Sequence, residues 1–313
     1  IEIQFLEWVN TLIRIFDKLE YIFIYVALLL FSGGLLHFLF INNSDHISVV
    51  TKILFPIIYI IVSILILQKR RLIKISIKEK WLLSLILLSI ASILWSVDKA
   101  VTFQRGVATI GTTIFGIYMG FRYSLKQQLV ILGWTLSTIV LLSLIVVIFM
   151  PEKGLFYDLR GTAWQGIFWH KNLLGKFMVL SILVFSLLII FTKKFEWKIV
   201  SVCFVILSFL LLIKSESITS LVVFTILCIS ILIFSQIRRN ILLGISISLF
   251  VSVMLFLLML LVYMNTGSLF NLLGRDATLT GRTEIWEVTL YLVMQNPIFG
   301  YGYGSFWNES SVL

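Results

Sequence analysis

The sequence predicts an all-α fold: a polytopic transmembrane helical bundle of about nine spans, with a large extracytoplasmic loop that contains helices. Of its 313 residues, 60% are hydrophobic and only 13% are charged, which is too little polar surface to cover a water-soluble fold. The apolar residues gather in runs that approach the roughly 17 to 25 residues needed to cross a hydrocarbon core. The net charge of +10 comes mainly from short connections between these runs, which indicates membrane orientation rather than nucleic-acid binding.

Residues 1–20 predict an amphipathic helix that lies on the membrane surface. Apolar side chains such as Trp8, Leu12 and Phe16 recur at helical spacing, while Arg14 and other polar residues occupy the rest of the helical wheel. A helix with one apolar and one charged face binds in the interface plane.

Residues 21–264 predict the transmembrane helical domain, interrupted by an outer loop at residues 151–172. We expect its apolar segments at residues 21–41, 49–67, 81–95, 106–121, 129–150, 173–191, 199–213, 219–235 and 241–264. Residues 265–313 predict a second extracytoplasmic loop, which we expect to be truncated because the chain ends within it. Long loops on a helical scaffold usually carry the function.

The distribution of Lys and Arg predicts the orientation. Alternate connections together with the N-terminal helix hold fifteen of the 25 basic residues, and the opposite side holds eight. The positive-inside rule makes the first side cytoplasmic, so the N-terminus is predicted inside and both large loops outside.

Several residue patterns that are missing from the sequence exclude classes of function. No Asp-x-Asp pair occurs, which argues against a metal-chelated nucleotide-sugar donor, and we expect neither a metal site nor a cofactor. No Asp or Glu lies inside an apolar segment, where a proton-coupled or sodium-coupled transporter usually has one. Both cysteines, Cys203 and Cys228, lie in apolar runs and are interpreted as small hydrophobic residues.

Arg160 and Arg282 are the strongest candidates for binding a ligand. Each lies in one of the two outer loops, next to a glycine that permits a close approach. A guanidinium grips phosphate oxygens with two parallel hydrogen bonds, so two that converge would suit a pyrophosphate at the membrane surface. The alternative is that each arginine reaches a lipid headgroup or pairs with Asp158 or Glu284.

His170 and Asn172 lie where the chain re-enters the membrane after the first outer loop. A neutral imidazole there can orient a hydroxyl or act as a base. The alternative, which is the more frequent case for a lone interfacial histidine, is a tolerated polar residue, with Asn172 as the N-cap of the next helix.

The run Gly300-Tyr301-Gly302-Tyr303-Gly304 matches phosphate-cradling loops only weakly, because no strand precedes it and no suitably spaced helix follows. We predict a tight, aromatic-rich turn at this place. Before it, Asn296-Pro297 is expected to end a helix that starts after Gly281.

Four linked motifs stand out along the chain. They are Leu94-Trp95-Ser96-Val97-Asp98 with Arg105; Arg160-Gly161 through Gly166-Ile167-Phe168 to His170-Lys171-Asn172; Gly281-Arg282-Thr283-Glu284-Ile285-Trp286; and Asn296-Pro297-Ile298-Phe299-Gly300-Tyr301-Gly302. In order, spacing and predicted outer placement they resemble the O-antigen ligase and polysaccharide polymerase superfamily over roughly residues 81–307.

The resemblance implies a metal-independent, inverting glycosyltransferase of the bacterial inner membrane, with its active face extracytoplasmic. Its donor would be a glycan on undecaprenyl pyrophosphate, and its acceptor a hydroxyl of another glycan or of lipid A core. A ligase and a polymerase share these motifs. A lipid-linked oligosaccharide flippase or transporter is the alternative from another class, and a noncatalytic scaffold is a third.

The resemblance also assigns roles to single residues. Arg160 and Arg282 match the outer-loop arginines that would hold the pyrophosphate, and Arg105 is a weaker member of that set. His170 is placed with the catalytic candidates, and Asn172 and Glu284 with the substrate-binding ones. The family's late-loop histidine does not occur before the chain ends, so no general base is assigned.

Overall fold

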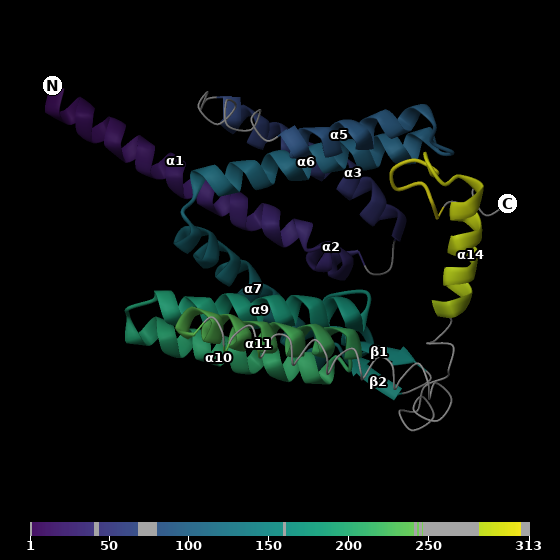
Figure 1. Cartoon of the computed structure of the whole chain (residues 1–313). Coiled ribbons are helices and arrows are strands. Elements are labelled where there is room, and N and C mark those ends of the chain that lie inside the picture. The colour runs from purple at the N-terminus through teal and green to yellow at the C-terminus, as the bar shows by residue number, and fades with distance from the viewer. Residues whose placement is uncertain are drawn as a thin grey trace. The chain divides into compact units, whose positions relative to one another are not determined.

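The computed structural model describes residues 2–40, 44–67, 80–158, 161–240, 243, 246 and 282–307. Two compact units make up the chain: Ile1–Ser76 with Gly111–Thr225, called unit 1, and Ile77–Ile110 with Ile226–Leu313, called unit 2. The described residues are mostly helical, as predicted, and include one two-stranded hairpin that the all-α prediction missed (Figure 1).

The helices have the following bounds. They are α1 (Glu2–Phe31), α2 (Gly34–Leu39), α3 (Ser44–Leu67), α5 (Lys80–Ala91), the 3-10 helix η1 (Ser92–Leu94), α6 (Lys99–Arg122), α7 (Leu125–Phe149), α8 (Pro151–Gly154), α9 (Lys171–Phe191), α10 (Phe195–Lys214), α11 (Ile218–Arg239) and α14 (Arg282–Gln295). Unit 2 contains α5, η1, the first half of α6, the second half of α11 and α14.

Five helices among the described residues are long and apolar enough to cross a membrane. They are Val49–Leu67, Leu125–Phe149, Lys171–Phe191, Phe195–Lys214 and Ile218–Ile237, each close to a predicted segment. Lys80–Leu94 is a shorter apolar helix, and the predicted segment 106–121 lies inside α6. Most of the predicted segment 241–264 lies outside the described residues, so the count of nine spans stays a prediction.

Helix α1 does not break where the sequence suggested a boundary. It runs without interruption through residue 20 to Phe31, so the expected surface helix and the start of the first span form one helix. The break comes instead at Gly33, whose φ of 71° is left-handed and suits glycine. Nothing between residues 20 and 31 is a glycine or proline that would end a helix earlier.

The centre of unit 1 is a closely packed group of helices in which α9 lies along α7 and α10 (Figure 1). Small residues permit the approach, because the fully buried hydroxyls of Ser181 on α9 and Ser208 on α10 lie 2.7 Å apart. Gly133 on α7 leaves room for Leu188 of α9, which a Cβ would meet at 2.8 Å. This pairing by small residues and shared hydroxyls is typical of membrane helices.

The predicted outer loop 151–172 is largely ordered. After α8, strands β1 (Leu155–Asp158) and β2 (Gly161–Trp164) pair antiparallel, with Asp158 opposite Gly161. The hairpin is anchored at Gly154, which packs on the α7 backbone and whose carbonyl accepts from the amides of Gln165 and Gly166. The extracytoplasmic position of this loop stays a prediction.

A charged cluster in unit 1 joins α1 to the end of α6. The carboxylate of Glu20 accepts hydrogen bonds from Arg122 Nε at 2.6 Å and from the hydroxyls of Tyr118 and Tyr123. A second carboxylate, Asp17, accepts from Arg122 Nη2 at 2.6 Å. The hydrogen bond that Arg122 donates to Glu20 raises the pKa of Arg122, and burial raises the pKa of Tyr123.

Candidate functional site

The site residues expected from the sequence fall into both units, and the structure describes them unequally. His170 and Asn172 belong to unit 1, and Arg105 belongs to unit 2; all three are described in full. Arg160 lies outside the described residues, and so do the side chains of Arg282 and Glu284 in the first turn of α14. The expected meeting of Arg160 and Arg282 over one anion therefore stays a prediction.

His170 is the N-cap of α9. Its Nδ1 accepts a hydrogen bond from the backbone amide of Asn172 at 3.1 Å, with extended backbone at the cap. The suggestion that Asn172 caps this helix is therefore wrong, because Asn172 is already the second helical residue. An imidazole nitrogen accepts as the usual side-chain oxygen does, provided that Nδ1 carries no proton.

The His170 ring also contacts the hairpin. Its centroid lies 4.7 Å from that of Phe156 on β1, with the rings tilted by 56°. The ammonium of Lys171 lies 5.6 Å from the centroid of the same Phe156 ring. His170 therefore links the start of α9 to the hairpin whose strands flank Arg160 in the sequence. Sequence reasoning missed Phe156, since nothing in its spacing marked a strand.

Two substitutions separate the capping role of His170 from a role in proton transfer. We expect His170→Ala to lower the free energy of unfolding by about 1 kcal/mol, because the cap and the ring contact are lost. His170→Asn keeps an N-cap acceptor and should cost less, with transfer activity retained if capping is its main role. Chemical denaturation in detergent measures the first effect, and an inactive but stable His170→Asn protein would instead favour a catalytic imidazole.

The segment between the hairpin and α9 carries one exposed aromatic side chain directly after two buried apolar residues. Ile167 and Phe168 are almost completely buried, whereas Trp169 is 54% exposed. The Trp169 ring stands edge-on to His37 of α2 at 6.0 Å between centroids. The sequence offered no signal for His37, which comes close only because the chain turns at Gly33.

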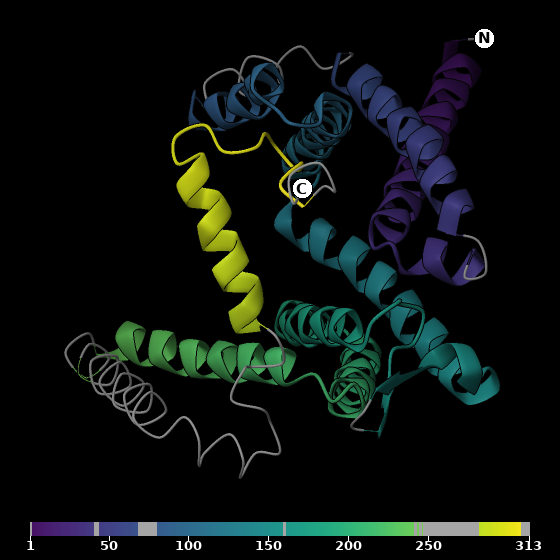
Figure 2. The ribbon, with the colours of Figure 1, turned by 90° about the vertical axis from the view of Figure 1, so that its right-hand side faces the viewer.

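In unit 2, the residues after α14 form the tight, aromatic-rich turn that the glycine run predicted, and this prediction is confirmed. Helix α14 ends at Gln295, directly before Asn296-Pro297, as expected. Residues 296–305, called the 296–305 turn, then loop back onto the neighbouring ends of α5 and α6, as the yellow segment in Figure 2 shows. Gly300, Gly302 and Gly304 all have positive φ, from 61° to 95°, which lets the chain curl tightly.

Backbone and side-chain hydrogen bonds attach this turn to residues 92–105, and we call these contacts the junction. The amide of Val97 donates to Tyr301 O at 3.1 Å, and the amide of Tyr303 donates to Ser92 Oγ at 3.0 Å. The hydroxyls that line the junction are buried and bond to one another: Ser96, Thr102 and Ser305. Two motifs some 200 residues apart in the sequence thus form one structure.

Glycine makes the junction possible at its tightest point. A Cβ on Gly302 would lie 2.4 Å from Ser96 Oγ and 2.8 Å from the Ser96 backbone Cα. The indole of Trp95 packs on Phe299, with 5.3 Å between ring centroids. Its Nε1 is buried and has no hydrogen-bond partner among the described residues.

Arg105 emerges from the junction as an exposed basic side chain. Its stem lies against Gly304, where a Cβ would come within 2.7 Å of Arg105 Cγ. Within the part of the chain that the structure describes, the Arg105 guanidinium makes no ion pair. A packed stem, together with a guanidinium that makes no ion pair within the described ranges, suits the binding of an anion.

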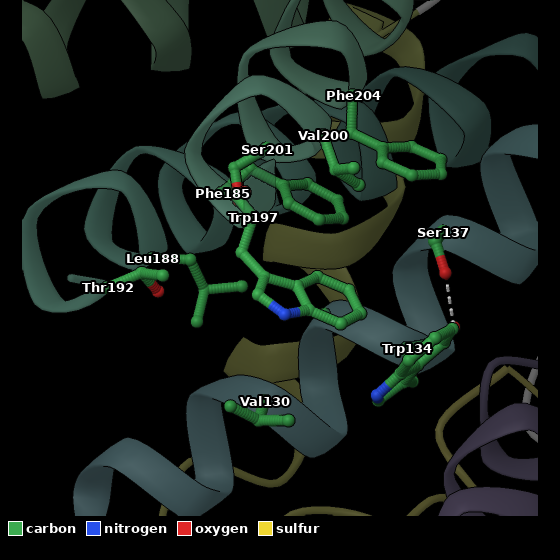
Figure 3. A pocket seen from close by; sticks show the side chains of 11 residues that line it. Val130, Trp134, Ser137, Phe185, Leu188, Thr192, Trp197, Val200, Ser201 and Phe204 are labelled. Atoms are coloured by element: carbon green, nitrogen blue, oxygen red, sulfur yellow. Dashed lines mark hydrogen bonds between the residues drawn. The ribbon is translucent and has the colours of Figure 1, made fainter. Parts of the chain in front are cut away.

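A separate pocket of about 330 Å³ lies in unit 1 between α7, α9 and α10 (Figure 3). Two of its polar side chains bond to their own helices, since Ser137 donates to Trp134 O and Ser201 donates to Trp197 O. Its lining residues are Val130, Gly133, Trp134, Ser137, Phe185, Leu188, Thr192, Trp197, Val200, Ser201 and Phe204. None of these is ionisable, so the pocket suits a hydrocarbon chain rather than a charged reaction centre.

The described part of the chain contains no cluster of side chains that could bind a metal ion. No group of three or more His, Cys, Asp or Glu side chains comes together within those residues. Cys203 and Cys228 are both unpaired and sit on different helices, as their apolar surroundings in the sequence suggested.

Comparison with known proteins identifies one family. Residues 202–312 match the family model described as O-antigen ligase, a stretch that includes α11, α14 and the 296–305 turn. No curated protein and no solved structure matches the chain. This match over residues 202–312 supports the predicted resemblance to the O-antigen ligase superfamily, and the five long apolar helices are those expected of a membrane protein.

Proposed function

We propose that this protein, which carries the O-antigen ligase match over residues 202–312, is a membrane glycosyltransferase with an undecaprenyl-pyrophosphate glycan as its donor. The acceptor is a hydroxyl at the outer face of the bacterial inner membrane. The observation that carries the proposal is the junction, because it joins two motifs some 200 residues apart in the sequence and holds Arg105, which makes no ion pair among the described residues, beside them.

The reaction we propose is a single displacement with inversion. The acceptor oxygen attacks the anomeric carbon, the bond from that carbon to the pyrophosphate oxygen breaks, and pyrophosphate leaves with the bonding electrons. The acceptor loses its proton to solvent or to a base. Because pyrophosphate is a good leaving group, the protein mainly has to supply fixed positive charge where negative charge develops.

Arginines supply that charge in the proposed mechanism, without a metal ion. Arg160 and Arg282 hold the two phosphates through paired hydrogen bonds, and Arg105 adds a third guanidinium. Asn172 and Glu284 contact the substrate. His170 uses Nδ1 as a helix cap, so only its Nε2 is left to meet an acceptor hydroxyl.

Lysine substitutions at the two loop arginines test the proposal. Arg160→Lys and Arg282→Lys should each lower transfer about tenfold, because a point charge cannot reproduce the paired hydrogen bonds of a guanidinium. The measurement is transfer by the full-length protein in liposomes supplied with an undecaprenyl-pyrophosphate glycan and candidate acceptors. Arg239→Lys, at the far end of α11, is the matched control.

If both loop variants transfer glycan at the wild-type rate, the proposed pyrophosphate site is contradicted. The same assay identifies the acceptor class. A single transfer to lipid A core is the result expected for a ligase, whereas a ladder of lengthening lipid-linked products is the result expected for a polymerase. Donor lipid that changes leaflet without any transfer would contradict the enzyme and favour a flippase.

A further inference from the structure

Tyr303 is held firmly yet leaves its ring exposed. Its amide donates to Ser92 Oγ at 3.0 Å, and its hydroxyl lies 3.0 Å from Thr109 Oγ1 on α6. The glycines on either side pack against Ser96 and the Arg105 stem so closely that neither position has room for a side chain. The residue is nevertheless 43% exposed.

This arrangement differs from that of an ordinary interfacial tyrosine. At a membrane surface the phenol hydroxyl usually reaches water or headgroups, and the ring lies among lipid chains. The Tyr303 hydroxyl instead contacts a hydroxyl of the protein, and the Thr109 hydroxyl is also 2.9 Å from Arg105 O. Tyr303 therefore offers a ligand its ring surface, beside a hydroxyl that already accepts a hydrogen bond from Thr109.

Arg105 lies on the same side of α6 as the Tyr303 contact. Arg105 and Thr109 are four residues apart in one helix, so their side chains occupy one face. The 296–305 turn touches both, through Gly304 at Arg105 and through Tyr303 at Thr109. The same turn thus holds the exposed Tyr303 close to the stem of Arg105, whose guanidinium makes no ion pair among the described residues.

We propose that Tyr303 and Arg105 form a subsite for a glycosyl phosphate. The flat, weakly polar face of a sugar ring packs on the Tyr303 ring, while Arg105 binds a phosphate oxygen next to that sugar. The inference rests on the proposed function, because it takes this ligand to be the first sugar and the adjoining phosphate of the donor. It makes Tyr303 a determinant of sugar recognition, a role that the sequence did not indicate.

Binding of two lipids by the full-length protein in nanodiscs separates the two roles. The probes are undecaprenyl pyrophosphate without sugar and the same lipid bearing a glycan. Tyr303→Leu should weaken binding of the glycan-bearing lipid about tenfold and leave binding of the bare lipid unchanged. Arg105→Gln should weaken binding of both lipids about tenfold, because both carry the phosphate.

Two further variants control for the hydroxyl and for folding. Tyr303→Phe keeps the ring and should restore binding of the glycan-bearing lipid, although it loses the contact with Thr109. Thr109→Val removes the same contact from the other side and should match Tyr303→Phe. In turnover, Tyr303→Leu should raise the KM for the donor more than it lowers kcat.

The outcomes distinguish failure of the proposed subsite from failure of the proposed transferase function. If Tyr303→Leu weakens binding of both lipids equally, or of neither, the subsite is overturned. If the wild-type protein shows the expected sugar dependence but transfers no glycan to any acceptor, the subsite stands and the proposed transferase function fails. A wild-type protein that binds neither lipid overturns both.

Discussion

Gly302→Ala should break the junction and lower the free energy of unfolding by about 3 kcal/mol. We expect no larger effect from the addition of one methyl group. The residue has φ of 95°, where a non-glycine residue is strained by about 1 to 2 kcal/mol. Its new Cβ would also lie 2.5 Å from Ser96 Cβ and 2.8 Å from Ser96 Cα. Since Ser96 Cα is backbone, no rotamer change relieves the clash, and overpacking adds about 1 to 3 kcal/mol.

Gly300→Ala is the matched control for this prediction. Gly300 also has positive φ, 61°, but a Cβ there would meet nothing within 4 Å. It should therefore show only the strain of the left-handed backbone, about 1 kcal/mol. Donor binding and the free energy of unfolding in detergent measure both variants, and equal losses in the two would show that close contact with Ser96 does not hold the turn.

Glu20→Ala should destabilise unit 1 by about 2 to 4 kcal/mol. Its carboxylate is the common acceptor for Arg122 Nε and two tyrosine hydroxyls, and only 12% of the side chain is exposed. Removing it leaves the Arg122 Nε and two buried phenols without this acceptor, although Arg122 keeps Asp17, and desolvated donors without partners are costly. A lowered midpoint of denaturant unfolding measures the effect.

Asp17→Asn provides the comparison on the same arginine. Asp17 Oδ1 lies 2.6 Å from Arg122 Nη2, as close as Glu20 does to Nε, but its side chain is 57% exposed. Water screens this ion pair, so its loss should cost less than about 1 kcal/mol. If the two substitutions cost the same, burial does not set the strength of this cluster. Neither substitution should alter donor specificity in the protein that remains folded.

Much of the helical architecture follows from local sequence. Runs such as 49–67 and 173–191 are apolar over the length of a membrane span, and helix is the structure that satisfies every backbone group within one segment. Asn296-Pro297 ends α14 as expected, because proline restricts the residue before it to extended conformations. These signals involve neighbours in the chain and need no tertiary information.

The hairpin and the helix cap show where local signals were insufficient. Strands β1 and β2 have only four residues each, too short for a clear alternating pattern, and their pairing depends on the anchor at Gly154. Asn172 is the better capping residue by type, yet His170 caps α9, and the same His170 ring packs against Phe156. In both places a contact with another element accompanies the local structure.

The sequence by itself determined the membrane class, most of the span positions, the turn after α14 and the family resemblance, because each follows from composition or from short motifs. Only the tertiary structure decided what those motifs do together. Ser96 and Ser305 are 209 positions apart and their hydroxyls lie 3.1 Å from each other, a pairing that no local pattern encodes. The exposed face formed by Arg105 and Tyr303 exists for the same reason: close packing at glycine brings distant segments into contact.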